Sequence, residues 1–161
     1  MSYSVHLDTS FLIRLFITSD KLHKNVIDYL KYFLENDFVL KCSTIALAEY
    51  CVKGKLRDLP LQYFRVIPFN TDAAEPTGDF AGYIFSIKEK LTLPNRIIIP
   101  NDTKLFAQAF IDSDTKYFIT CDIESMKIFS CLKQQFKIHY ELIDFNIPPD
   151  QYFGYLKLSE L

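Results

Sequence analysis

The sequence predicts an α/β protein in which helices cover a mostly parallel β-sheet. Short apolar runs typical of strands alternate along the chain with segments whose apolar residues recur every three or four positions. Of the 161 residues, 49% are hydrophobic, and the 15 Phe and 10 Tyr can fill a substantial core. A chain of this length and composition is most simply one globular domain.

In the first half of the chain the alternation begins with a strand that ends at an acid, Asp8. The predicted elements are a strand at Tyr3–Leu7, helices at Thr9–Ile17 and Lys21–Glu35, a strand at Phe38–Cys42, and a helix from Ser43 or Thr44 to near Gly54. The second of these helices is amphipathic and about four turns long.

The second half continues the alternation. Pro76 to Gly78 are expected to interrupt a helix there, and Pro100 disfavours helix at Ile99. The predicted elements are a strand at Arg65–Phe69, a helical stretch from Thr71 to Leu91, an extended segment at Arg96–Ile99, a helix that Asp102 begins, a strand at Tyr117–Thr120, a helix at Ile123–Leu132 and a strand at Lys137–Ile143.

Composition limits the classes of function. The formal net charge of -2 excludes the strongly basic profile of many nucleic-acid binders, although an acidic site that holds divalent cations can still meet phosphate. The four cysteines form no CxxC pair, which indicates a reducing compartment. The sequence shows neither a signal peptide nor an apolar stretch of about 20 residues, so we expect a cytoplasmic protein that is not in the membrane.

Four acids form the pattern that points to chemistry. Asp8 and Asp122 follow strands, where ligands of open α/β sheets collect, and Asp102 stands at a helix start. Each of these three also has a structural explanation as a helix cap or first-turn acid. Glu49 differs, because the surrounding run Ala46 to Cys51 is otherwise mostly apolar and would place its carboxylate near the buried side of a helix.

A cluster of such carboxylates would repel itself unless a cation were present. Oxygen ligands favour Mg2+ or Mn2+ over zinc, and the three histidines show no zinc-ligand spacing. His6 and His139 alternate with apolar residues in predicted strands, so we expect both to be structural.

The order and surroundings of these acids resemble the PIN domain, the nuclease fold of VapC-type toxins. The similar segments are HLDTSFLIRLF, TIALAEY, NDTKLFAQAF and FITCDIESMKIF, which span His6 to Phe129. The resemblance implies a three-layer fold with sheet order 3-2-1-4-5, in which the first and fourth strands bring Asp8 and Asp122 together. The family core would cover residues 1–145. The extension at 146–161 departs from the family pattern because it continues past the usual end of that core, and we expect it to pack on the domain or on a partner.

The resemblance further implies roles for individual residues. The catalytic acids would be Asp8, Glu49, Asp102 and Asp122. Asp8, Asp102 and Asp122 would be the ligands of Mg2+ or Mn2+. Ser10, Thr120 and Glu124 would support them. Lys104 departs from the family pattern, since an apolar residue is usual there.

By the same resemblance the activity would be that of a metal-dependent endoribonuclease, and an antitoxin protein would be its partner. A metal ion would activate water and stabilise the pentacovalent phosphate. RNA would meet the basic side chains Lys53, Lys55, Arg57 and Lys104, although the first three also fit a solvated helix end. A homodimer is expected.

Two other readings stay open. A phosphatase of the haloacid dehalogenase type would use Asp8 as a nucleophile, but that site needs a second Asp where this chain has Ser10. A non-catalytic PIN-like module that binds RNA or protein would keep the acids as structural caps. The chain has no glycine-rich nucleotide loop and no acyl-transfer signature.

Overall fold

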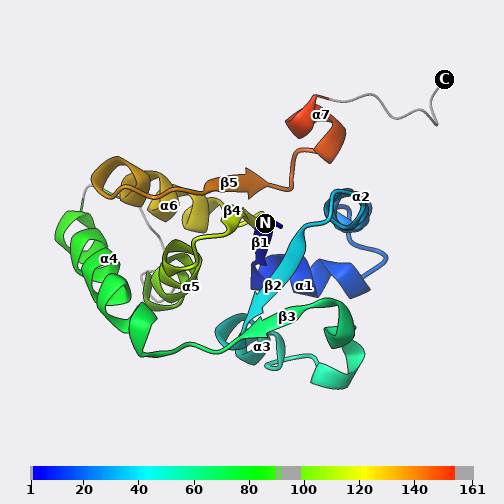
Figure 1. The fold of residues 1–161 in the computed structure, drawn as a ribbon, viewed down its shortest axis with the longest axis horizontal. Helices are drawn as coiled ribbons and strands as arrows, with labels where there is room; N and C mark the ends of the chain where they lie inside the picture. Colours follow the sequence, from blue (N-terminus) through cyan, green and yellow to red (C-terminus); the bar gives the residue numbers. More distant parts are fainter. Residues whose placement is uncertain (1, 90, 92–98, 155–161) are drawn as a thin grey trace.

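The structure is a computed structural model, and it describes residues 2–89, 91 and 99–154. Within these residues a parallel five-stranded sheet has the order β3-β2-β1-β4-β5 (Figure 1). The strands are β1 (Ser4–Leu7), β2 (Val39–Ser43), β3 (Arg65–Ile67), β4 (Thr115–Thr120) and β5 (Glu141–Asp144). The predicted fold class and strand order are therefore confirmed.

The central strand β1 lies between β2 and β4, and all of its residues are buried. The chain goes from β1 to β2 on one side, and β4 comes back beside β1 on the other. This is the point where the strand order reverses, and ligands of open parallel sheets bind just beyond the carboxyl ends of the strands there. The fold thus places Asp8 at this position directly after β1.

Helices account for most of the remaining described residues. The α-helices are α1 (Thr9–Phe16), α2 (His23–Glu35), α3 (Thr44–Tyr50), α4 (Ala74–Ile87), α5 (Ile99–Ile111), α6 (Ile123–Gln135) and α7 (Pro149–Phe153), with short 3-10 helices η1 (Leu56–Asp58), η2 (Leu61–Tyr63) and η3 (Thr71–Ala73).

Two consecutive residues of β4 show which helices cover which face of the sheet. Tyr117 lies against Phe33 of α2 and Phe153 of α7, whereas Phe118 lies against Phe106 of α5. Successive side chains of a strand point to opposite faces. Helices α2 and α7 therefore cover one face, and α5 covers the other together with α4 and α6, which pack on it. Figure 1 shows α4, α5 and α6 grouped on one side of the sheet.

Several predicted elements differ from the structure. Helix α4 is continuous, because Pro76 lies in its first turn, where the missing N–H would have no partner. The same tolerance lets α5 begin at Ile99, just before Pro100, so an extended Ile99 and a helix beginning at Asp102 were wrong. Residues 96–98 lie outside the described residues.

The last strand is also shorter than predicted. It begins at Glu141, and residues 137–140 form an irregular segment in which the backbone N–H of Ile138 bonds to the carbonyl of Phe136. His139 is consequently exposed in a loop and is not a strand residue, and its Nε2 lies 3.3 Å from the carbonyl oxygen of Asp112.

The described part of the extension packs on the domain. The ring of Phe153 in α7 stacks on Tyr32 of α2 with centroids 4.0 Å apart. The hydroxyl of Tyr29 donates to the carbonyl of Ile147 at 2.8 Å. These contacts fix residues 147–153 against α2.

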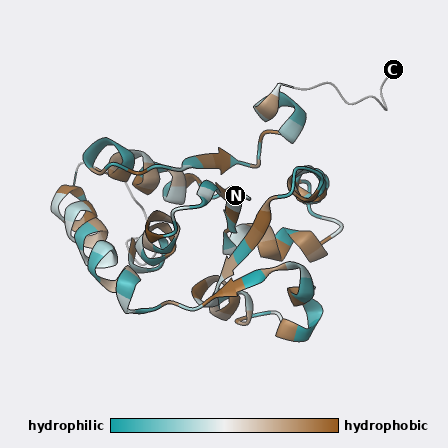
Figure 2. Ribbon diagram, viewed as in Figure 1, coloured by the Kyte–Doolittle hydropathy of each residue, from teal (hydrophilic) through white to brown (hydrophobic). Residues whose placement is uncertain are grey.

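Hydropathy follows the layers. In Figure 2 the hydrophobic colour is concentrated on the strands, and the helices alternate between hydrophobic and hydrophilic residues. The core includes the fully buried Phe11, Phe33, Phe106 and Phe118. Within the described ranges, no helix is long and apolar enough to cross a bilayer.

Candidate functional site

The four acids predicted from the sequence come from four different elements. Asp8 caps the N-terminus of α1, and Asp122 caps that of α6. Glu49 lies in the last turn of α3, and Asp102 lies in the first turn of α5. Because β1 and β4 are parallel neighbours, the residues that follow them share one edge of the sheet. The helix-cap reading therefore holds for Asp8 and Asp122, and it is compatible with a site at that edge.

Asp8 is the most buried of these acids, with 7% of its surface exposed. Its Oδ2 accepts hydrogen bonds from the hydroxyl of Ser10 at 2.6 Å and from the hydroxyl of Thr120 at 2.8 Å. The backbone N–H of Ser10 adds a longer contact of 3.3 Å. Burial raises the pKa of Asp8, and these hydrogen bonds act against the rise. Ser10 and Thr120 thus fix the orientation of this carboxylate.

Glu49 is half-buried, and both of its oxygens accept hydrogen bonds. The hydroxyl of Thr9 donates to Oε2 at 2.5 Å, and the amide of Asn101 donates to Oε1 at 2.6 Å. Sequence reasoning did not single out Thr9 or Asn101. Their only sequence signal is that each stands directly beside a predicted acid.

Asp102 carries the least satisfied oxygen of the group. Its Oδ2 is buried without a hydrogen-bond partner among the residues that the structure describes. Burial raises the pKa of Asp102 to about 8. The next causes of this shift are the negative charges of Asp8, Asp122 and Glu49, while a hydrogen bond from Ser125 opposes it. The structure therefore brings the four acids within electrostatic range of one another.

Asp122 is the exposed member of the group. Its Oδ1 accepts the backbone N–H of Glu124 at 2.8 Å and that of Ser125 at 3.2 Å. The Glu124 carboxylate is half-buried, and in the described part of the chain it has neither a hydrogen bond nor a salt bridge.

These carboxylates have the donor set that a hard divalent cation prefers. The unpartnered Oδ2 of Asp102 and the mutual repulsion of the acids both favour a cation between them. Within residues 2–89, 91 and 99–154, however, no three His, Cys, Asp or Glu side chains lie close enough together to form a ready-made metal site. The carboxylates are therefore the right type of ligand for such an ion, but they would have to move closer together to bind it.

The basic residues predicted to contact RNA are spread around this edge. Lys53, Lys55 and Arg57 are exposed in the segment that follows α3. Lys53 lines a cavity of about 640 Å³ that Thr9 and Glu49 also line. Lys104 is half-buried and forms no salt bridge within the described part of the chain. It does not neutralise the acids by direct ion pairing there.

The cavity beside Glu49 is largely apolar. Its wall includes Ile13, Phe16 and Ile17 from the end of α1, and Val52, which is 79% exposed. The apolar surface of this cavity thus adjoins the acids on the α1 and α3 side.

A second polar cluster, which sequence reasoning missed, lies at the opposite edge of the sheet. Lys41 of β2 is only 3% exposed and forms ion pairs with Asp112, at 2.5 Å, and with Asp114. His6 contacts the same Asp112 oxygen at 3.0 Å. Although burial of Asp112 opposes the effect, hydrogen bonds from His6 and Lys41 hold its pKa well below the usual range.

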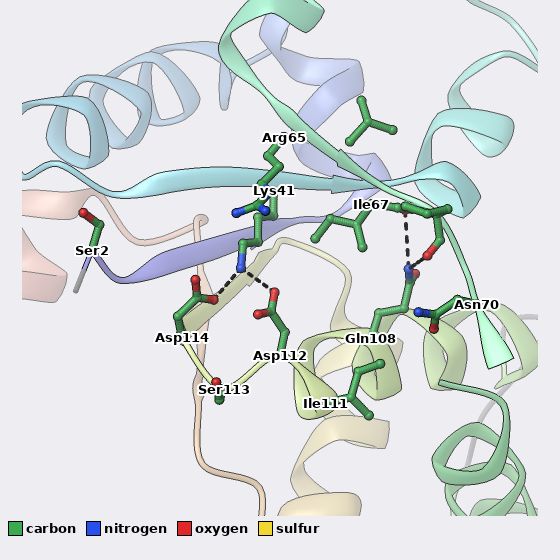
Figure 3. Close-up of a pocket in the computed structure, with 12 residues that line it drawn as sticks. Ser2, Lys41, Arg65, Ile67, Asn70, Gln108, Ile111, Asp112, Ser113 and Asp114 are labelled. Atoms are coloured by element: carbon green, nitrogen blue, oxygen red, sulfur yellow. Dashed lines mark hydrogen bonds and ion pairs between the residues drawn. The ribbon is translucent and has the colours of Figure 1, made fainter. Parts of the chain in front are cut away.

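Figure 3 shows the Lys41 amino group pointing toward both carboxylates, in the wall of a cavity of about 730 Å³. Ser4 of β1 donates its hydroxyl to Asp114 at 3.0 Å. The cluster therefore ties β1 and β2 to the turn that precedes β4. Because its charges are already paired with one another, we assign it to stability of the sheet and not to catalysis.

The sequence matches no protein-family model and no curated protein. Solved structures similar to it include the following two. One is VapBC2 from Rickettsia felis, bound to a DNA fragment from their promoter, with a TM-score of 0.59 and 19% identity over 86% of this chain and 96% of that chain. The other is DNA-bound VapBC from Salmonella typhimurium, with a TM-score of 0.57 and 16% identity over 89% and 98% of the two chains.

The chain has the PIN-like fold. At these identities the likeness establishes the fold and leaves the role of each residue to the geometry. In this PIN-like chain the four acids lie within electrostatic range of one another at the edge where the strand order reverses.

Proposed function

We propose that this PIN-like protein is an endoribonuclease that hydrolyses RNA phosphodiester bonds with the help of Mg2+ or Mn2+. The observation that carries the proposal is that Asp8, Glu49 and Asp122 lie within electrostatic range of Asp102, whose buried Oδ2 has no hydrogen-bond partner among the described residues. Four acids in mutual repulsion cost folding free energy. A bound cation would remove this cost by balancing the negative charges of the four carboxylates.

Asp8, Asp102 and Asp122 are the residues that would hold the cation. When bound, it would lower the pKa of a water and balance the charge that develops on the phosphate. The protein's own contribution is orientation: Ser10 and Thr120 fix Asp8, and the α6 N-terminus fixes Asp122.

Lys53 is the basic residue best placed to contact the RNA backbone, because it lines the same cavity as Glu49. Lys55 and Arg57 follow it on the exposed segment and would add to a path for phosphates. Lys104 stands two residues after Asp102 and forms no ion pair within the described residues, so its charge is also free for phosphate.

A protein partner is the second part of the proposal. The two similar structures are both VapBC complexes. In this chain the exposed apolar side chains Ile13, Phe16, Ile17 and Val52 border the acids. We propose that an antitoxin segment covers this apolar cavity and thereby blocks access to Glu49.

Cleavage of a 5'-labelled single-stranded RNA tests the enzymatic proposal. Cutting is expected with Mn2+ or Mg2+ and not with EDTA, and the products should carry a 5'-phosphate and a 3'-hydroxyl. Products with cyclic phosphate ends, or equal cutting in EDTA, would contradict hydrolysis by a metal-held water.

The non-catalytic alternative rests on the helix caps formed by Asp8 and Asp122. In that case the protein would bind RNA without cutting it, and Asp8→Asn would leave RNA affinity unchanged. The phosphatase reading is weakened by the geometry, because Ser10 donates its hydroxyl to Asp8 and occupies the position that a second Asp would need.

A further inference from the structure

The feature that the proposed function leaves unexplained is the way Glu49 is held. Thr9 at the start of α1 and Asn101 at the start of α5 each donate to one of its two oxygens, at 2.5 and 2.6 Å. The contacts join residues 40 and 52 positions apart in sequence, so they are made only in the folded chain. The carboxylate is thus held from both sides by two different helices.

We infer that Asn101 and Thr9 are positioning residues that hold the Glu49 carboxylate in the orientation needed at the cation site. The inference rests on the proposed function, since it concerns the same four acids. It adds two residues to that site and gives Glu49 a role different from that of Asp102.

The chemistry of the two donors supports this role. Each carboxylate oxygen accepts about two hydrogen bonds, so one donor on each oxygen leaves lone pairs free. The side chains of Thr9 and Asn101 are neutral, whereas Lys or Arg in the same place would cancel the negative charge. Glu49 therefore has no cationic partner in these two contacts, and it keeps part of its acceptor capacity while its side chain is fixed.

The placement of the donors along the chain supports it as well. Thr9 directly follows Asp8, and Asn101 directly precedes Asp102. The first turn of α1 and the first turn of α5 each deliver one acid to the cluster and one donor to Glu49. A small shift of either helix would consequently move Glu49 together with the neighbouring acid.

Glu49 and Asp102 are held in contrasting ways. Both oxygens of Glu49 have donors, whereas Oδ2 of Asp102 is buried and has none among the described residues. The free oxygen suits direct ligation of a cation. The doubly held carboxylate suits a fixed acceptor for the water molecules around that cation, because partners of this kind orient the ligands of metal sites.

A double-mutant cycle on Mn2+ affinity tests the inference. Mn2+ binding is measured by calorimetry for the wild type, Asn101→Ala, Glu49→Ala and the double variant. Loss of an orienting partner commonly weakens metal binding by about 10- to 100-fold. We expect Asn101→Ala to weaken binding at least tenfold in the wild type and to have little further effect in Glu49→Ala.

The matched control is Asn36→Ala. Asn36 also donates its side-chain amide, to the carbonyl of Tyr32 at 2.8 Å, but it lies at the end of α2 away from the acids. It should leave Mn2+ affinity unchanged. Equal losses from Asn101→Ala with and without Glu49, or no loss at all, would overturn the role of Asn101.

Thr9 offers a second test through conservative variants. Thr9→Ser keeps the hydroxyl donor and should bind Mn2+ as the wild type does, whereas Thr9→Val keeps the size and should bind more weakly. The reverse order would show that Thr9 acts through its methyl group and would overturn its role.

RNA cleavage is measured on the same proteins to separate the two proposals. A wild type that binds Mn2+ but cuts no RNA contradicts the proposed function, while the affinity cycle still decides the role of Asn101. A wild type that cuts RNA, with Asn101→Ala unaffected in both assays, contradicts the further inference alone. A wild type that binds no Mn2+ contradicts both.

Discussion

The hydroxyl of Thr120 at the end of β4 donates a 2.8 Å hydrogen bond to the carboxylate of Asp8, 112 residues earlier at the end of β1. This contact joins the two neighbouring strands at the point where the strand order reverses. It fixes one oxygen of Asp8 beside the carboxyl end of β4. The electrostatics of the site therefore depend on how close this fixed carboxylate lies to the other three acids.

The first prediction concerns the dependence of stability on pH without metal. The pKa of Asp102 is raised to about 8 in the folded chain, from about 3.9 in the unfolded chain. Between these two pKa values the folded chain holds the proton more tightly than the unfolded chain does. The stabilisation is therefore fully present below pH 4, and the free energy of unfolding falls as the pH rises toward 8. Thermal unfolding in EDTA should give a melting temperature that falls across this range.

Asp102→Asn should make this decline shallower and raise the melting temperature of the metal-free protein at pH 8. It should also reduce the stabilisation that Mn2+ gives the wild type. Asp79→Asn, an exposed acid on α4, is the control and should behave as the wild type. If the metal-free stability rose from pH 5 to pH 8 equally in all three proteins, burial and the neighbouring charges would not destabilise the ionised form of Asp102.

The second prediction concerns the buried Lys41. Lys41→Met removes the cation from between Asp112 and Asp114, whose side chains are 24% and 35% exposed. Breaking a fully buried pair costs about 3–5 kcal/mol, and the partial exposure of the carboxylates should reduce this to about 1–3 kcal/mol. Urea unfolding measures the loss.

Lys24→Met serves as the comparison for Lys41→Met. Lys24 pairs with Asp28 at 3.1 Å, but its side chain is 77% exposed. Its loss should change the unfolding free energy by less than about 1 kcal/mol. Equal effects of the two variants would mean that the cluster at the opposite edge does not stabilise the sheet.

Much of the fold follows from local patterns. The alternation of apolar periods predicts the order of strands and helices, and the acids after β1 and β4 predict the edge at which they meet. The element ends were less predictable. Pro76 and Pro100 were read as helix breakers, yet each lies in a first turn, and only the packed structure shows where that turn begins.

The missed residues have a common cause. Lys41 reads as a polar residue in a strand, and nothing near it in the sequence indicates that Asp112 and Asp114 will surround it. Asn101 likewise meets Glu49 only after α3 and α5 pack together. Contacts between distant parts of the chain depend on tertiary packing, which local periodicity does not encode.

The third prediction concerns the turn after α3. A Cβ added to Gly54 would lie 2.4 Å from the ring of Tyr50, which is buried and lines the cavity beside Glu49. Gly54→Ala should therefore force a shift of the ring and cost about 1–3 kcal/mol. Chemical denaturation of the metal-free protein is the measurement.

Gly82→Ala provides the contrast. A Cβ at Gly82, in the middle of α4, would have no described atom within 4 Å apart from the backbone of its own helix and its chain neighbours. Because alanine has a higher helix propensity than glycine, the free energy of unfolding of this variant should rise by up to about 1 kcal/mol. If Gly54→Ala were as stable as Gly82→Ala, the close approach of Gly54 to Tyr50 would not constrain the turn.

The fourth prediction tests the central claim that the four acids form one metal-dependent site. The measurement is the rate of single-stranded RNA cleavage in Mn2+ by the wild type and by the variants Asp8→Asn, Glu49→Gln, Asp102→Asn and Asp122→Asn, with Asp79→Asn as control. We predict that Asp79→Asn cuts at the wild-type rate and that each of the four others loses at least about 100-fold. Cleavage that survives in both of the single variants Asp8→Asn and Asp122→Asn, or cleavage that continues in EDTA, would contradict the account.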